Sequence, residues 1–245
     1  MTERLVYDVL PSTQSRAVEL VRAGAGTETY VVARSQSEGR GRGEHRWSSP
    51  PGGLYLSWIG PDLSASGPSV SLALAASLHQ LLGEQWGVPS ELKWPNDLVC
   101  PGPSGRVRKI AGLLPERIVG PRGARSVVGI GLNVVTPRVD FPPELRDHVA
   151  EISDYHQPPP PLEEVEATVV RWLGRTLPEL ATSDGISRWL AVGRAILYGR
   201  GREARVDGVP AGRIVGLHAD GALWLDGPQG PSIVRSGELF IEEPT

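Results

Sequence analysis

Apolar residues in the first half of the chain recur at spacings that predict short strands and two helices. The segment 68–86 repeats apolar residues at helical spacing and predicts a helix. An earlier helix is expected to run to about Arg22, with Ser12 or Thr13 as its N-cap and Gly24 just past its end. Apolar runs predict strands over 3–9, 28–34, 54–59, 92–94, 97–100, 108–114 and 126–135, with a turn at 101–105.

The pattern changes in the second half. Proline-rich stretches at 137–143 and 158–161 predict loops. An amphipathic helix is expected over Leu162–Leu180, and a shorter one over about 184–192. From Gly199 onward, five short apolar segments separated by glycines predict a small barrel or sandwich. We therefore expect a main domain over 1–196 and a small β domain over 197–245.

Composition excludes several classes of protein. Of the 245 residues, 40% are hydrophobic and 22% charged, which is typical of a globular domain and not of a disordered chain. The net charge of −3 disfavours a strongly basic nucleic-acid binder. A single cysteine, Cys100, excludes an internal disulfide and a cysteine-based zinc site. No apolar run is long enough to span a membrane and no signal peptide is evident, so we expect a cytoplasmic protein.

The basic residues are strongly biased towards arginine. Among 25 basic residues, only Lys93 and Lys109 are lysines. A GC-rich genome explains such a bias, but it does not explain why two lysines are kept. A compact ammonium cannot be replaced by a planar guanidinium in a tight polar site, so both lysines are candidate functional residues.

A glycine- and arginine-rich segment follows the second predicted strand. It runs from Gln36 to Trp47 and contains the sequence Gly-Arg-Gly-Arg at 39–42. Glycines allow a backbone to approach a ligand closely, and arginines bind phosphate or carboxylate groups. The segment is therefore a candidate anion cradle. A solvated basic loop and an RNA-binding segment remain alternatives.

Three further clusters combine polar residues with glycine or proline. They are Lys93-Trp-Pro-Asn-Asp97, Lys109-Ile-Ala-Gly112-Leu-Leu-Pro-Glu116 and Gly129-Ile-Gly131-Leu-Asn133. The first places a cation, an amide and a carboxylate around a rigid proline, and its carboxylate suits Mg²⁺ or an amine. Taken alone, the first cluster also fits an exposed turn, and the third fits a packed core strand.

In this order, the four clusters resemble the pattern of the biotin protein ligases, and the resemblance covers essentially the whole chain. It implies an α+β fold, with a central mixed, mostly antiparallel sheet flanked by helices and a C-terminal SH3-like barrel. The family's optional DNA-binding domain is expected to be absent. It also implies a ligase that adenylates biotin to biotinyl-5′-AMP with ATP and Mg²⁺. Biotin then passes to a lysine of a biotin carboxyl carrier protein.

The resemblance also implies roles for individual residues. Those expected to bind biotin are Ser12, Thr13, Gln14, Gln36, Gly39 and Arg40. Those expected to serve ATP, magnesium and the reacting centre are Arg42, Lys93, Asn96, Asp97 and Lys109; all but Asn96 are expected to be catalytic, and Asp97 is the metal ligand. Those expected to complete the binding surface around the adenylate are Gly41, Trp47, Gly112, Gly131 and Asn133. Gln14, Gly43 and His45 depart from the usual family pattern, which has Asn at the first position and often basic residues at the other two.

Two other functions are retained as alternatives. One is a lipoate or octanoate ligase or transferase of the same superfamily. Such enzymes share the fold but lack the combination of Gly-Arg-Gly-Arg with Lys-Trp-Pro-Asn-Asp. The other is a non-catalytic nucleic-acid-binding module that uses the arginine-rich loop. No DNA and no membrane partner is expected, and a homodimer through exposed sheet edges occurs in the family.

Overall fold

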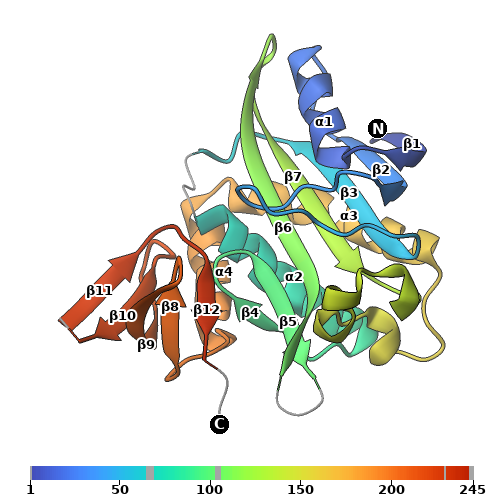
Figure 1. Ribbon diagram of the computed structural model, residues 1–245. Coiled ribbons are helices and arrows are strands. Elements are labelled where there is room, and N and C mark those ends of the chain that lie inside the picture. Colours follow the sequence, from blue (N-terminus) through green and yellow to red (C-terminus); the bar gives the residue numbers. More distant parts are fainter. Residues whose placement is uncertain (1, 65–68, 103–105, 229, 243–245) are drawn as a thin grey trace.

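The computed structural model describes residues 2–64, 69–102, 106–228 and 230–242. A seven-stranded sheet forms its centre (Figure 1). Its strands are β1 (Glu3–Leu10), β2 (Thr29–Gln36), β3 (Gly53–Gly60), β4 (Glu91–Lys93), β5 (Asp97–Pro101), β6 (Val107–Gly120) and β7 (Gly123–Asn133). The helices are α1 (Thr13–Arg22), α2 (Val70–Trp86), α3 (Leu162–Leu180) and α4 (Ser183–Ala195).

The central sheet is mixed, as the sequence predicted. Its order is β1-β2-β3-β7-β6-β5-β4. Strands β1 and β2 are parallel because α1 connects them, and the other neighbours are antiparallel. Ser12 is the N-cap of α1, and Gly24 follows the helix at a φ of 92°. Both ends of α1 therefore lie where the sequence placed them.

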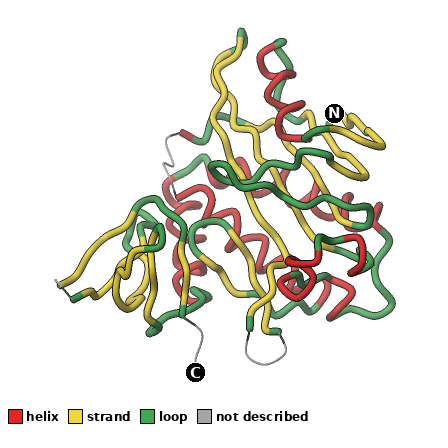
Figure 2. Tube along the Cα trace, in the orientation of Figure 1, coloured by secondary structure: helices red, strands yellow, loops and turns green. Residues whose placement is uncertain are grey.

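The two faces of the sheet are covered differently. Because successive side chains of a strand point to opposite faces, Trp58 and Ile59 of β3 belong to different cores. Trp58 packs in the larger core with α2, α3 and α4, whereas Ile59 packs in a smaller core with α1. Figure 2 shows the helices gathered behind the sheet and α1 alone near its upper end. The part of the second face that α1 leaves uncovered carries the cleft described below.

The C-terminal segment forms a second sheet. Its strands are β8 (Glu203–Val206), β9 (Val209–Leu217), β10 (Leu223–Gly227), β11 (Gly230–Val234) and β12 (Leu239–Ile241), in the order β11-β10-β9-β8-β12. The five predicted strands are thus confirmed. Within the described residues the two edge strands do not pair, so this sheet is not closed into a barrel. Leu217, Leu223 and Leu225 join the larger core, which fixes the second sheet against the first.

Two regions differ from the sequence-based expectation. Strand β6 was expected to end at Leu114 but continues to Gly120, through Pro115. Strand β5 pairs with β6 only as far as Gly112, so beyond that residue the β5 side of β6 has no neighbouring strand. Proline is tolerated at position 115 because no N–H donor is required on that side. The proline-rich stretch 137–143 was expected to be a loop but contains a short 3₁₀ helix at Arg138–Asp140, and a second begins at its end, Pro143–His148. A third follows at Ile152–Asp154. Of the expected turn at 101–105, residues 103–105 lie outside the described residues.

Candidate active site

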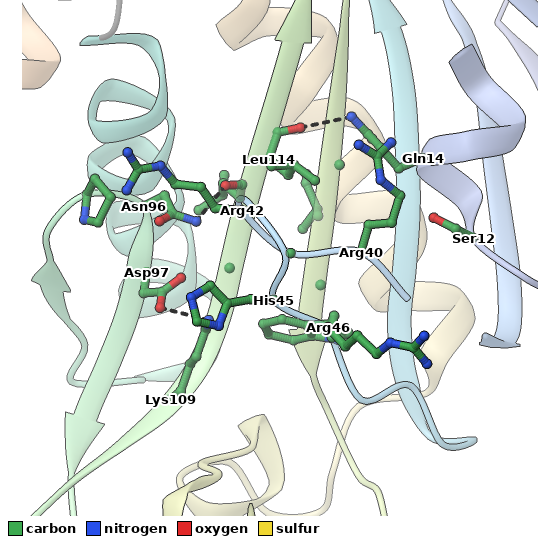
Figure 3. Close-up of a pocket in the computed structure, with 18 of the residues that line it drawn as sticks. Ser12, Gln14, Arg40, Arg42, His45, Arg46, Asn96, Asp97, Lys109 and Leu114 are labelled. Atoms are coloured by element: carbon green, nitrogen blue, oxygen red, sulfur yellow. Dashed lines mark hydrogen bonds and ion pairs between the residues drawn. The ribbon is translucent and has the colours of Figure 1, made fainter. Parts of the chain in front are cut away.

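A cleft of about 240 Å³ lies on the uncovered face of the central sheet. Its walls come from the N-terminal end of α1, the loop between β2 and β3, strands β5 to β7 and the start of β12. The cleft brings together all of the candidate residues except Gly39 and Asn133. Figure 3 shows side chains from these separate elements converging on it.

The end of the cleft next to α1 contains a cluster of uncharged polar side chains. The backbone N and Oγ1 of Thr13 donate to Oε1 of Gln36 at 2.7 and 3.1 Å. Nε2 of Gln36 donates to Ser49 Oγ at 2.7 Å, and the buried Ser57 hydroxyl lies 3.0 Å from Thr13 Oγ1. Because these groups hold each other, their positions are fixed before a ligand enters.

Gly39 supports this polar end from outside the cleft. A Cβ atom at this position would lie 2.3 Å from the Trp47 carbonyl oxygen and 2.7 Å from Ser49 Oγ. A larger residue would therefore push the loop away from Gln36. Gly39 thus allows the loop to close, and its own atoms do not line the cavity.

The middle of the cleft contains an ion pair covered by an aromatic ring. Lys109 Nζ lies 2.7 Å from Asp97 Oδ2 and 4.9 Å from the centroid of the Trp47 ring. Gly112 and Gly131 are direct neighbours on β6 and β7, and the indole of Trp47 lies against both. An ammonium held between a carboxylate and an aromatic face combines two favourable electrostatic contacts.

Two buried polar atoms in this region have no partner among the described residues. They are Asp97 Oδ1 and Trp47 Nε1. A buried polar atom without a hydrogen bond costs free energy, so such atoms indicate places where a ligand, an ion or water completes the site. One is an anionic acceptor and the other is a donor.

The motif around Pro95 forms the wall opposite α1. Nδ2 of Asn96 donates to the Leu113 carbonyl at 3.0 Å, so this amide holds β5 against β6. Nε1 of the buried Trp94 donates to the Gly221 carbonyl at 3.2 Å, which ties the motif to the second sheet. Lys93 lies on the same wall.

The glycine- and arginine-rich loop is held at two points. Arg40 forms an ion pair with Glu116, and Nη1 of Arg42 donates to the Gly237 carbonyl at 2.7 Å. Next to Arg42, Nε2 of His45 lies 3.5 Å from Glu238 Oε2. The loop therefore bridges the central sheet and the second sheet.

Asn133 lies at the end of β7, behind the cleft wall. It is buried, and its Nδ2 donates to the Lys109 carbonyl at 3.1 Å. The structure thus places it as a support for the backbone of Lys109 and not on the cavity surface.

Polar lining residues outside the predicted motifs include Ser57 and Glu238. Ser57 carried a signal, because it is the single small polar residue in the mostly apolar run Leu54–Ile59. Glu238 carried no local signal, because it reaches the cleft only through the packing of the second sheet.

Two searches of the described residues bear on the class of site. No group of three or more histidine, cysteine or acidic residues is close enough together to hold a metal ion. No helix in this part of the chain is long and apolar enough to cross a membrane.

Sequence comparison finds relatives that match this arrangement. The profile of the Biotin/lipoate A/B protein ligase family matches residues 6–133. The bifunctional ligase/repressor BirA of Bacillus subtilis is 39% identical over 158 residues, which are 62% of this chain and 47% of that protein. The chain therefore covers about half the length of that relative. The biotin–[acetyl-CoA-carboxylase] ligase of Paracoccus denitrificans is 30% identical over 94% of this chain and 97% of its own length.

Structural comparison agrees. The biotin protein ligase of Aquifex aeolicus, solved in complex with biotin and ATP, superposes with a TM-score of 0.82 at 25% identity, and all of each chain is covered. Fold and cleft thus define an α+β protein with a ligand site on the open face of a mixed sheet. The chain belongs to the biotin/lipoate A/B protein ligase family.

Proposed function

We propose that this chain is a biotin–protein ligase. It adenylates biotin with ATP, releases pyrophosphate and transfers biotin from biotinyl-5′-AMP to a lysine of a biotin carboxyl carrier protein. The observation that carries the proposal is that one cleft combines the uncharged polar groups of Thr13, Gln36 and Ser57 at one end with the cations Lys93, Lys109 and Arg42 at its centre. The names of the Paracoccus and Aquifex relatives support the same reaction.

The polar end suits the ureido group of biotin. This group presents two N–H donors and one carbonyl acceptor, and the cleft offers hydroxyl and amide groups of both kinds. A lipoyl or octanoyl chain would give these groups no partner, and a site built for hydrogen bonding rejects a ligand that lacks them. We therefore favour biotin over lipoate or octanoate. Ser12 and Gly39 hold this end in place.

The cationic centre suits the first half-reaction. A carboxylate oxygen of biotin attacks the α-phosphorus of ATP and pyrophosphate leaves, so two anions must be brought together. Lys109, Lys93 and Arg42 provide fixed positive charge at this point of the cleft. Preorganised charge of this kind lowers the barrier because it need not reorganise during the reaction. Asn96 holds the wall, and Trp47, Gly112 and Gly131 form the surface for the adenylate.

Magnesium fits one residue of this centre. Asp97 Oδ1 is buried and has no hydrogen-bond partner in the described part of the chain, and a carboxylate oxygen is a preferred Mg²⁺ ligand. The ion is commonly held by one or two carboxylates together with substrate phosphates, and the carboxylate of Asp97 would serve as such a ligand. When bound, it would neutralise phosphate charge.

The second half-reaction needs a covered intermediate. The amine of the carrier lysine attacks the carbonyl carbon of the mixed anhydride and AMP leaves. Water would compete for the same carbon. The loop of residues 39–46 lies over the cleft and can exclude water from bound biotinyl-5′-AMP until the carrier lysine reacts.

Further proposals concern the organisation of the protein. The catalytic domain would span 1–196, and the C-terminal domain would span 197–245. Five short strands in one sheet support an SH3-like arrangement for the second domain, with the barrel open between β11 and β12 within the described residues. We propose a cytoplasmic location because carboxylase carrier proteins are intracellular partners. A homodimer would form through the exposed edge of the sheet at β1.

The test is biotin-dependent exchange of radioactive pyrophosphate into ATP, with and without Mg²⁺. Lipoate and octanoate serve as competing acids, and a purified carrier domain serves as acceptor for labelling. We expect exchange with biotin and labelling of one carrier lysine. Exchange with lipoate or octanoate alone would favour the other branch of the family. Tight RNA retention on a filter without any exchange would favour a nucleic-acid-binding module.

A further inference from the structure

Glu116 lies outside the cleft wall, at the junction of two site elements. It is on β6, and its carboxylate binds Arg40 through both oxygens, at 2.7 and 3.1 Å. Oε2 of Glu116, which accepts the longer of these two bonds, also accepts from Nε2 of Gln14 at 2.7 Å. One carboxylate thus joins the first turn of α1 to the glycine- and arginine-rich loop.

Both N–H groups of the Gln14 amide are engaged by the protein. Its Nε2 has three acceptors within reach, the Leu114 carbonyl at 3.1 Å, Glu116 Oε2 and the Val127 carbonyl at 3.3 Å. Its Oε1 accepts from Ser57 Oγ at 3.0 Å. An amide nitrogen has only two hydrogens, so no donor remains for a ligand. Figure 3 shows Gln14 beside Leu114 with Arg40 next to it.

Gly129 makes room for this longer amide. A Cβ atom on Gly129 would lie 2.6 Å from Gln14 Oε1. Residue 14 is a glutamine where the biotin ligase pattern has asparagine, and the extra methylene carries its amide across Gly129 towards Glu116. The geometry therefore fits a structural link better than a contact with substrate.

We propose that Glu116 is a positioning residue for the proposed ligase reaction, and that Gln14 acts through it and donates no hydrogen bond to biotin. Gln14 fixes the carboxylate, and the carboxylate holds Arg40 and sets the loop of residues 39–46 over the biotin end of the cleft. The loop is then anchored at two places, by Arg40 on the central sheet and by Arg42 on the second sheet. Biotin affinity depends on the first anchor.

The chain offers a matched control beside this pair. Arg117 follows Glu116 on β6 and points to the opposite face, where it forms a two-point ion pair with Asp62 at 3.2 Å. The two pairs have similar exposure, with side-chain fractions of 40% and 27% for Arg40 and Glu116 and 50% and 30% for Arg117 and Asp62. Asp62→Asn therefore removes a comparable ion pair that does not touch the loop.

The experiment compares Glu116→Gln, Arg40→Met, their double variant and Asp62→Asn. Hydrogen exchange of the amides 39–46 is measured without ligand, and KM for biotin and kcat are measured by pyrophosphate exchange. We expect the loop amides to exchange roughly fivefold faster in Glu116→Gln and in Arg40→Met, and KM for biotin to rise by a similar factor with kcat nearly unchanged. The double variant should be no worse than either single variant, because both remove the same contact.

Loop exchange in Glu116→Gln equal to that in Asp62→Asn would overturn the proposal, and so would additive effects in the double variant. The hydrogen-exchange measurement needs no substrate. A wild-type chain that lacks pyrophosphate exchange would therefore contradict the proposed function alone, and the positioning role would still be decided by the loop amides.

Discussion

Replacing Gly131 by alanine tests whether Trp47 is fixed in the cleft by the two facing glycines. The new Cβ would lie 2.3 Å from Cε2 of the Trp47 indole and 2.7 Å from both Cζ2 and Nε1. These separations are far below van der Waals contact. Since Tyr55 and Gly112 flank Gly131 across the sheet, the strand cannot move aside and the indole must move.

The magnitude follows from the cost of an extra methyl group in a packed site. Such overpacking costs about 1–3 kcal/mol. For a chain of this length, a loss of about 2 kcal/mol lowers Tm by about 4–8 °C. Displacement of Trp47 also removes the ring from above Lys109, so we expect adenylation to fall by more than stability alone would require.

Gly174→Ala is the matched control. Gly174 is exposed in the interior of α3, and a Cβ atom there would meet nothing within 4 Å. Alanine should raise helix stability by about 0.5–1 kcal/mol and leave adenylation unchanged. The assays are thermal unfolding by circular dichroism and biotin-dependent pyrophosphate exchange. A Gly131→Ala protein as stable and as active as Gly174→Ala would refute the packing argument.

Three further predictions use the same assays or simple chemistry. Lys109→Arg should lose most pyrophosphate exchange although its charge is kept, because a planar guanidinium does not fit between Asp97 and Trp47; activity within about twofold of wild type would contradict this. The amides 39–46 should gain hydrogen-exchange protection when biotinyl-5′-AMP binds, and unchanged protection would count against loop closure. Burial raises the pKa of the Cys100 thiol to about 12, so the thiolate fraction at pH 8 is lower than for an ordinary cysteine. Native protein should therefore react with a disulfide reagent far more slowly than unfolded protein, and equal rates would show that the thiol is exposed.

Helices and strands with a regular apolar pattern and clear end signals were predicted well from the sequence. The helix Leu162–Leu180 was predicted at its observed bounds because its apolar face is regular and a run of prolines precedes it. The extension of β6 beyond Leu114 was missed because a proline normally ends a strand. Its tolerance depends on which strands lie beside β6, and the order of strands in a sheet is not a local property of the sequence.

In the candidate site, too, local motifs were predictable from the sequence and long-range contacts were not. Most of the candidate residues meet in one cleft because the motifs lie in loops and strands that border the same face of the sheet. Contacts between distant segments could not be predicted. Arg40 and Glu116 are 76 residues apart, and Arg42 and Gly237 are 195 apart. The contact of Asn133 with the Lys109 backbone was also not predicted, because its position at the end of β7 gave no indication of which way its side chain points.

The bias towards arginine was the most informative feature of composition. Both lysines, Lys93 and Lys109, line the cleft. The reason is geometric for Lys109, whose Nζ fits between the Asp97 carboxylate and the Trp47 ring while its Cε would lie 3.3 Å from any Cβ on Gly112. A flexible stem with a compact charge passes this gap, whereas a flat guanidinium needs more width at its end. A mutational pressure that replaced lysine elsewhere would thus be opposed at such positions, so rare lysines in an arginine-rich chain indicate where a site is tightly built.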